Sequence, residues 1–392
     1  MKIVAFVGET FYSNNGSYYT KQTSAAFIQD AIGTESVYVC SPSQPVDMPP
    51  KGFSTVVQEE HFYSFPSYSS TKDFALKSIF NRDFINSYKA KADKVINEHK
   101  GAYFWIRTPS IGSIIFGIQA LKAGEKVIHH MCANASSTWR DNKYSLPEKL
   151  FGFLFSRYLR FKLGQICKHK NTINLCTGDV LEDFSAQYSP ANTFQFVDLM
   201  AKAPKCGDVV ESQSKPLKVL FLGRIVKDKG VLDLISVANK LKGLVEITII
   251  GDGPDLIEAQ QEVEKLSLQE SVHFTGQLSH SHLGQYFKNT SLVVVPSNNH
   301  YEGFPRVIME AWAHQKPVIV SHVGGIKAFV KHGENGLIFK PGSQSELYDS
   351  LLSLVENENL YSHLEVGAQN MAKYSNQQYW LDRLLTIIKE KK

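Results

Sequence analysis

The chain has 392 residues, of which 43% are hydrophobic and 20% charged, so its composition is globular and excludes a disordered protein. Its length suffices for two domains of ordinary size. The net charge of +4 does not by itself indicate nucleic-acid binding. The five cysteines show no C-x-x-C pair and no metal-ligand spacing, which favours reduced thiols in a cytoplasmic protein without a metal.

The N-terminal residues predict the opening of a doubly wound α/β domain. The apolar run 3–7 predicts a buried strand and is too short for the core of a signal peptide. A polar loop with a turn signal follows at 14–17, and 23–31 is expected to be helical. No G-x-G-x-x-G follows the strand, so the dinucleotide-binding fingerprint is absent.

Further apolar runs continue this alternation of strands and helices. Strands are predicted at 37–40, 102–106, 126–130 and 174–178, and residues 72–99 are expected to be mostly helical. His129 and His130 are neighbours on one strand and point to opposite faces, so they are not a natural metal pair. One of them can reach a ligand-binding cleft, and an ordinary core or surface histidine is the alternative.

The segment 147–170, PEKLFGFLFSRYLRFKLGQICKHK, combines large apolar side chains with six basic residues and a single acid, Glu148. A cationic helix of this kind can lie on an anionic membrane surface. It can equally be a core helix with a basic outer face, and both alternatives stay open. No apolar run approaches the roughly 18 residues needed to span a bilayer.

A second domain is expected after a polar linker at 202–216. It opens with the strand 217–222 and contains a βαβ unit: strand 292–295, a polar loop, a helix from about Pro305 to Ala313, and strand 318–320. The loop lies at the carboxyl end of a strand, where open α/β sheets bind ligands. The helix N-terminus there suits a phosphate.

Two carboxylates make this unit unusual, since they repel a phosphate. Glu302 lies in the loop and Glu310 lies inside the expected helix. Sugar hydroxyls give a reason for both, because a carboxylate accepts hydrogen bonds from a vicinal diol. The alternative is that both are ordinary surface acids.

Several motifs of the C-terminal half occur together in a known order. Glu302-Gly303-Phe304-Pro305 with Glu310 resembles the E-x7-E motif of family 4 retaining glycosyltransferases, the glycosyl transferases group 1 of GT-B fold. The accompanying segments resemble the family's G-R-x4-K-G, G-x-G-P, F-x-G and glycine-rich tail: Gly223-Arg224 with Lys229-Gly230, Gly251 to Pro254, Phe274 to Gly276, and Gly324-Gly325 through Gly342.

The resemblance implies an α/β protein of GT-B fold, with two Rossmann-like doubly wound domains facing a central cleft. Residues 1–200 would form the N-terminal acceptor-binding domain and 201–372 the C-terminal nucleotide-sugar-binding domain. Residues 373–392 would form a helix that crosses back to the N-terminal domain.

The resemblance also implies roles for particular residues in a metal-independent reaction. Arg224 and Lys229 would stabilise the leaving diphosphate, Glu302 would bind and orient the donor sugar, and Glu310 would bind the ribose. The remaining donor-binding candidates are Gly303, Phe304, Pro305, Arg306, Val307, Gly223, Gly253 and Gly276.

The residues expected to bind the acceptor match the family's motifs less well than the donor-binding residues do. Gly16 and Ser17 stand where relatives often have paired glycines, and Arg107 stands where many have a histidine, so a charge contact to acceptor or phosphate is expected from Arg107. His130 completes this group. Ala328 replaces a glutamate of the relatives' G-G-x-x-E motif.

The resemblance implies a retaining glycosyltransferase that uses a UDP- or GDP-sugar and a glycan or lipid-linked acceptor. It would act in bacterial surface polysaccharide or lipopolysaccharide synthesis, in the cytoplasm or at the inner face of the plasma membrane. Two alternatives remain: a sugar-nucleotide epimerase of the same fold, and a non-catalytic subunit that binds the nucleotide sugar.

Overall fold

A computed structural model describes the chain except for residues 22–23, 51–52, 69–70, 141–143, 202–214, 300 and 392. The chain divides into two compact units. The first comprises Met1–Asp198 with Leu381–Lys392, and the second Leu199–Trp380. The boundaries thus fall near 198 and 380, where the sequence placed them at 200 and 372. Most of the predicted linker 202–216 lies outside the described residues.

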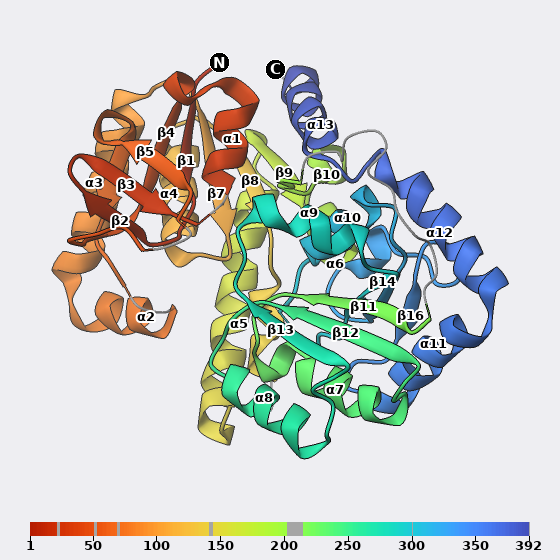
Figure 1. Cartoon of the computed structure of the whole chain (residues 1–392). Helices are drawn as coiled ribbons and strands as arrows, with labels where there is room; N and C mark the ends of the chain where they lie inside the picture. The colour runs from red at the N-terminus through yellow and green to blue at the C-terminus, as the bar shows by residue number, and fades with distance from the viewer. Residues whose placement is uncertain are drawn as a thin grey trace. The chain divides into compact units, whose positions relative to one another are not determined.

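The first unit is built on a mostly parallel sheet of order β10-β9-β8-β7-β1-β4-β2-β3-β5, with β6 also paired to β4 (Figure 1). Its strands are β1 Ile3–Phe6, β2 Phe11–Asn14, β3 Ser17–Thr20, β4 Val37–Pro45, β5 Thr55–Gln58, β6 Phe62–Phe65, β7 Tyr103–Thr108, β8 Lys126–Met131, β9 Thr172–Cys176 and β10 Thr193–Gln195. Its helices are α1 Ser24–Ile32, α2 Thr71–Phe80, α3 Arg82–Glu98, α4 Ile111–Lys122, α5 Leu146–Cys167 and α6 Asp179–Ala186.

The loop expected at 14–17 is the turn of a β-hairpin. Asn15 and Gly16 have φ values of 47° and 74°, and β2 and β3 pair antiparallel on either side of them. An Asn-Gly pair favours this turn because both residues tolerate positive φ. The first helix therefore starts only after an inserted hairpin, rather than directly after a loop.

The second unit has a parallel sheet of order β13-β12-β11-β14-β15-β16. Its strands are β11 Leu217–Leu222, β12 Val245–Ile250, β13 Val272–Gly276, β14 Leu292–Val295, β15 Val318–Ser321 and β16 Leu337–Phe339. Its helices are α7 Val231–Lys240, α8 Leu256–Lys265, α9 His280–Lys288, α10 Arg306–Ala313, α11 Gln344–Glu356 and α12 Glu358–Ala372. This is the strand order of a doubly wound nucleotide-binding domain, and the prediction of two such α/β domains is confirmed.

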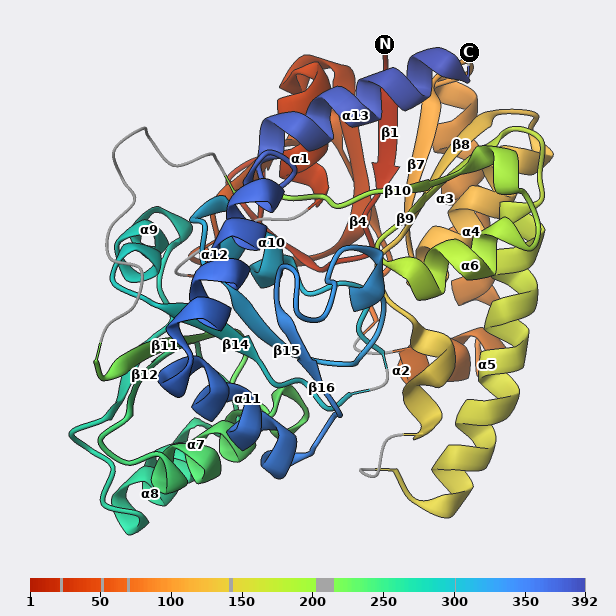
Figure 2. The same ribbon diagram turned by 90° about the vertical axis from the view of Figure 1, so that its right-hand side faces the viewer.

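The C-terminal helix α13, Gln377–Glu390, starts in the second unit and ends in the first (Figure 2). Within the first unit, the Nζ of Lys391 donates a hydrogen bond to the carbonyl oxygen of Ala191 at 2.7 Å. Arg383 and Lys391 both lie over the ring of Phe194. None of the helices in the described part of the chain combines the length and apolar composition needed to cross a membrane.

The core of the first unit contains a histidine whose protonation opposes folding. His129 is fully buried, with Nε2 bonded to Thr108 Oγ1 at 2.9 Å and Nδ1 to Asn174 Oδ1 at 3.1 Å. Burial lowers the pKa of His129 from 6.5 to about 4, and the Asn174 contact opposes this only in part.

Because the folded pKa lies below the unfolded one, the unfolded chain binds the extra proton between pH 6.5 and 4. We therefore expect His129 to reduce stability as pH falls through this window, by up to about 3 kcal/mol. In NMR of histidine-labelled protein, an imidazole that does not titrate down to about pH 5 should be present, and His129→Asn should remove its resonance. His169→Asn, at a half-buried histidine of the same unit, should leave it in place. Titration of every histidine near pH 6.5 would contradict the assignment.

Candidate functional site

The second unit brings its predicted site residues together at the carboxyl edge of its sheet. Strands β11 and β14 are neighbours there, and the chain leaves them toward opposite ends of the sheet. This is the switch point at which doubly wound sheets bind ligands. Arg224 follows β11 and is exposed, Lys229 lies in the turn before α7, and Glu302 lies in the loop after β14.

The carboxylate of Glu302 is held by two partners. Lys229 Nζ donates a hydrogen bond to Oε1, and Asn299 Nδ2 donates one to Oε2 at 2.8 Å. The side chains of Lys229 and Glu302 are 22% and 12% exposed, so solvent screens this ion pair less than one on the surface. Both oxygens therefore have a defined orientation.

Asn299 also fixes the backbone of the same loop. Its Oδ1 accepts hydrogen bonds from the N–H groups of Tyr301 at 3.2 Å and Glu302 at 3.0 Å, and its side chain is buried. An asparagine that bonds backbone two and three residues ahead forms an Asx-type turn. Asn299 was not among the site residues predicted from the sequence, although its position three residues before the glutamate is a signal for such a turn.

Asp228 connects this loop to the turn before α7. Its carbonyl oxygen accepts from the Asn298 N–H at 2.9 Å, and its Oδ2 accepts from the Tyr301 hydroxyl at 3.1 Å. Burial, then the negative charge of Asp228, its hydrogen bond and Glu302 raise the pKa of Tyr301, while Arg224 opposes the shift. Arg224 thus acts electrostatically on the same cluster, with the tyrosine kept protonated.

Two glycines allow these backbones to approach closely. Gly230 has φ 73°, and a Cβ there would overlap the carbonyl oxygen of Pro296 after β14. Gly324 has φ 55°, and a Cβ there would overlap the carbonyl oxygens of Glu302 and Gly303. The N–H of Gly325 donates to the Gly303 carbonyl at 2.6 Å. The Gly324-Gly325 pair therefore holds the Glu302 loop from its other side.

Helix α10 begins at Arg306, with Pro305 as its N-cap. Its inner face is buried, and Trp312 anchors it through a hydrogen bond from Nε1 to the Asn335 carbonyl at 3.0 Å. Glu310 lies on the half-exposed side of the helix. Among the described residues, no hydrogen bond is found for the N–H groups of Gly303, Phe304 or Val307. These groups and the helix dipole can bind an anion.

The other predicted glycines lie at neighbouring strand ends. The Gly223 N–H donates to the Ile250 carbonyl at 3.0 Å, and the Gly251 N–H donates to the Gly276 carbonyl at 3.0 Å. The Gly253 N–H donates to Asp252 Oδ1 at 2.7 Å. They connect the ends of β11, β12 and β13, beside the loop that carries Arg224.

The candidates in the first unit do not form one cluster. Gly16 and Ser17 belong to the β2–β3 hairpin, where the Gly16 carbonyl accepts from the Glu59 N–H at 3.0 Å. His130 is fully buried, with Nε2 3.1 Å from Thr177 Oγ1 and its ring packed against Trp105 and Phe196. The structure thus places His130 in the core, the alternative that the sequence left open.

Arg107 lies at the corresponding switch point of the first unit, between β1 and β7. Its Nη1 is 3.1 Å from Glu9 Oε1, and its Nε is 3.8 Å from Asp198 Oδ2. Burial lowers the pKa of Arg107, but Cys132, Asp198 and Glu9 outweigh it and keep the guanidinium charged. Two carboxylates thus face the charge that we expected to contact an acceptor or a phosphate.

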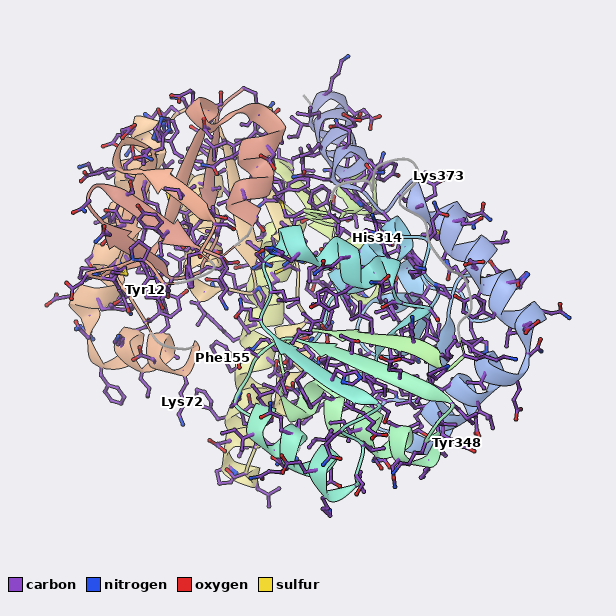
Figure 3. The ribbon with its side chains drawn as sticks, viewed as in Figure 1. Tyr12, Lys72, Phe155, His314, Tyr348 and Lys373 are labelled. Atoms are coloured by element: carbon purple, nitrogen blue, oxygen red, sulfur yellow. The ribbon has the colours of Figure 1, made fainter. Side chains whose placement is uncertain are left out.

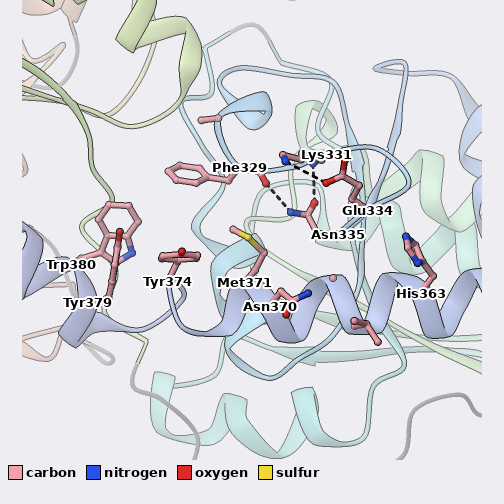
Figure 4. Close-up of a pocket in the computed structure, with 13 residues that line it drawn as sticks. Phe329, Lys331, Glu334, Asn335, His363, Asn370, Met371, Tyr374, Tyr379 and Trp380 are labelled. Carbon is pink, nitrogen blue, oxygen red and sulfur yellow. Dashed lines mark hydrogen bonds and ion pairs between the residues drawn. The ribbon is translucent and has the colours of Figure 1, made fainter.

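A cavity of about 540 Å³ in the second unit lies beside the loop that follows Gly325 (Figure 4). Phe329 and Trp380 line it, together with residues of α12. The ring of Phe329 packs edge-on against Phe304 at 4.9 Å. None of Arg224, Lys229, Glu302 or Glu310 lines this cavity. Within the described ranges, no group of three or more His, Cys, Asp or Glu side chains is placed to hold a metal ion.

Comparison with known proteins agrees with this geometry. Residues 208–371 match the family model described as glycosyl transferases group 1. This part of the chain is therefore similar to the group 1 glycosyltransferases. Over 154 residues the chain is 30% identical to the 2-deoxystreptamine N-acetyl-D-glucosaminyltransferase of Niallia circulans, which is 38% of this chain and 39% of that protein. The aligned region is thus less than half of either protein.

Solved structures show the same overall fold across the whole chain. Anabaena Alr3699/HepE, in complex with UDP, aligns with a TM-score of 0.70 and 17% identity, covering 100% of both chains. The lipopolysaccharide outer core galactosyltransferase WaaB, in its apo form, aligns with a TM-score of 0.67 and 16% identity, again over 100% of both. The predicted GT-B fold class is therefore confirmed.

We expect Asn299→Ala to impair this site without unfolding it. The substitution removes one contact to the Glu302 carboxylate and two to the loop backbone, so Glu302 loses its fixed orientation. Turnover of a sugar nucleotide should fall at least tenfold, with the melting temperature changed by a few degrees. Asn298→Ala is the matched control, because the Asn298 contact to Asp228 is made by its backbone. Equal turnover in the two variants would contradict the role of Asn299.

Proposed function

We propose that the chain is a retaining glycosyltransferase that moves a sugar from a UDP- or GDP-sugar to a glycan or lipid-linked acceptor. The observation that carries this proposal is the fixed Glu302 carboxylate beside Lys229 at the switch point of the second sheet. A carboxylate suits sugar hydroxyls and a cation suits a diphosphate. A sugar nucleotide carries both groups.

Each side chain then has a role in the reaction. Arg224 and Lys229 stabilise the negative charge that develops on the leaving diphosphate, which is electrostatic catalysis. The N–H groups near the start of α10 assist them. Glu302 orients the donor sugar and Glu310 binds the ribose. The acceptor hydroxyl attacks the face from which the diphosphate leaves, so the anomeric configuration is retained, and no metal ion is required.

The proposal places the reaction in bacterial surface polysaccharide or lipopolysaccharide synthesis. Support comes from the fold that the chain shares with a lipopolysaccharide galactosyltransferase and with a protein solved in complex with UDP. The enzyme would act in the cytoplasm, with a peripheral contact between the basic segment 147–170 and an anionic membrane at its inner face.

The donor assignment is tested by binding of UDP, GDP and their sugars in the presence of EDTA. One nucleotide should raise the melting temperature, because a ligand stabilises the folded state that binds it. Arg224→Ala should weaken its binding about tenfold or more, since a charge-assisted contact contributes roughly 1.5–3 kcal/mol. Lys227→Ala, at a nearby exposed lysine paired with Glu258, should leave binding unchanged.

Turnover of the bound donor separates the alternatives. A transferase releases the nucleoside diphosphate only with a glycan or lipid acceptor, and EDTA should not reduce its rate. An epimerase would change the sugar without an acceptor, and a binding subunit would show no turnover. Activity lost to EDTA and restored by Mn²⁺ would overturn the metal-independent mechanism.

Glu302→Gln and Glu310→Gln should change the kinetic constants in different ways. The ribose is bound about equally in the ground and transition states, so loss of Glu310 should mainly raise the donor KM. Glu302 acts at the reacting sugar, so its loss should mainly lower kcat. Affinity for the nucleoside diphosphate, which lacks the sugar, should fall only in the Glu310 variant. The reverse pattern would exchange the two roles.

A further inference from the structure

Helix α5 exposes an unusual number of large apolar side chains. Leu150, Leu154 and Phe161 are 63%, 61% and 59% exposed, whereas Leu159 and Ile166 on the other side of the helix are buried. The neighbouring Phe151, Phe153 and Tyr158 are also exposed. Helical geometry places the first three on one face. The inner face packs against α4 and β9, so the exposed set is not part of the core of the first unit.

Basic side chains accompany this face. Arg157 and Lys168 are exposed, and on the helical wheel they fall close to Leu150 and Phe161. Glu148 is the only acid in the segment 147–170, against six basic residues. A helix that combines a solvent-facing apolar surface with positive charge has the chemistry of one that lies on an anionic lipid surface.

A cavity of about 540 Å³ opens beside this face, within the first unit. Helix α2 contributes Ala75, α5 contributes Phe151 and Phe155, and Trp139 comes from the short helical turn before α5. Figure 3 shows Phe155 on α5 and Lys72 on α2, which both line the cavity. Phe151 belongs both to the cavity and to the exposed set of α5.

The cavity also reaches the edge of the sheet. Pro109, directly after β7, lines it, and β7 borders the switch point at which Arg107 meets Glu9. An elongated ligand could therefore lie with an apolar end in the cavity and a polar end at the ligand-binding edge of the sheet.

We propose that the α5 face docks on an anionic lipid bilayer and that the adjoining cavity takes the hydrocarbon chain of a phosphate-bearing lipid acceptor. This inference rests on the proposed function, and it selects the lipid-linked class among the acceptors. The aromatic and aliphatic lining excludes water from the hydrocarbon chain, and the burial of each CH₂ group there favours binding.

The rim of the cavity carries charges for the phosphate. Lys72 Nζ lies 3.9 Å from Glu148 Oε1, and both side chains are largely exposed, so this ion pair is weak and can be exchanged for another anion. Arg140 lies over the ring of Trp139, 5.3 Å from its centre. Lys72 thus lines the cavity and Arg140 adjoins its Trp139 wall, and the carboxylate beside Lys72 belongs to Glu148 of α5 itself.

Binding of dodecyl phosphate below its critical micelle concentration tests the cavity. The wild-type chain should bind it, and Ala75→Phe, which places a ring in the cavity, should weaken binding at least tenfold. Ala90→Phe adds the same ring to an exposed position of α3 and should have no effect. Lys72→Ala should weaken the binding of dodecyl phosphate but not that of dodecyl maltoside, whose head group is uncharged. Equal binding by the two phenylalanine variants would overturn the proposal.

Binding to lipid vesicles tests whether the exposed face of α5 docks on a bilayer. With phosphatidylglycerol vesicles brominated on the acyl chains, the wild type should bind and its tryptophan fluorescence should be quenched, and Trp139→Phe should abolish most of the quenching. Leu150→Glu should reduce vesicle binding at least fivefold, whereas Ile257→Glu, at an exposed apolar residue of α8, should not. Equal binding to phosphatidylcholine vesicles, or quenching that survives Trp139→Phe, would contradict the inference.

Nucleotide binding, measured on the same samples, separates the two proposals. The Ala75 and Leu150 variants should bind the nucleotide as the wild type does, because the residues assigned to it lie in the second unit. Lipid binding without any nucleotide binding would overturn the proposed function and leave the lipid site standing. Nucleotide binding without lipid binding would overturn the lipid site and leave the proposed function standing.

Discussion

The site of the second unit depends on how closely three backbone segments approach one another at the edge of its sheet. Gly230 lies against the end of β14, and Gly324 lies against the loop that carries Glu302. Any side chain at either position would push the segments apart. The contact of Lys229 to the Glu302 carboxylate joins two of these segments, so it depends on their close approach. The arrangement of the site therefore depends on two positions, Gly230 and Gly324, that cannot carry a side chain.

The two units use charge differently at equivalent places in their sheets. In the second, Arg224 is exposed beside backbone N–H groups at the start of α10, which suits an anion. In the first, Arg107 faces the carboxylates of Glu9 and Asp198, so the local charge is negative despite the arginine. That balance suits hydroxyl groups better than a phosphate.

Sequence patterns predicted the parts of the fold that depend on regular repetition. The apolar runs located β1, β11, β14 and β15, and the sequence pattern placed the start of α10 at Pro305, one residue before its observed start at Arg306. The β2–β3 hairpin was missed because its strands are short and partly polar, so the Asn15-Gly16 turn was read as a loop. Period-two alternation is too weak a signal over four residues.

The parts of the site that could not be predicted depend on tertiary contacts. Asn299 is one polar residue in a polar loop, and only the fold shows that its side chain is buried against Glu302. His130 and Arg107 belong to strands whose ends face a ligand site in many proteins. Whether such a side chain turns into the core, as His130 does, or meets carboxylates, as Arg107 does, depends on segments far away in sequence, such as β9 and Asp198.

The path of the C-terminal helix limits how the two units can be separated by truncation or exchanged in chimeras. The chain leaves the first unit near residue 198 and returns to it at 381, so the first unit is not one continuous stretch of sequence. A truncation after residue 198 would expose the ring of Phe194 and remove the hydrogen bond that Lys391 makes to Ala191. Chimeras that exchange the second unit between relatives therefore need two junctions, and the last twelve residues must come from the parent of the first unit.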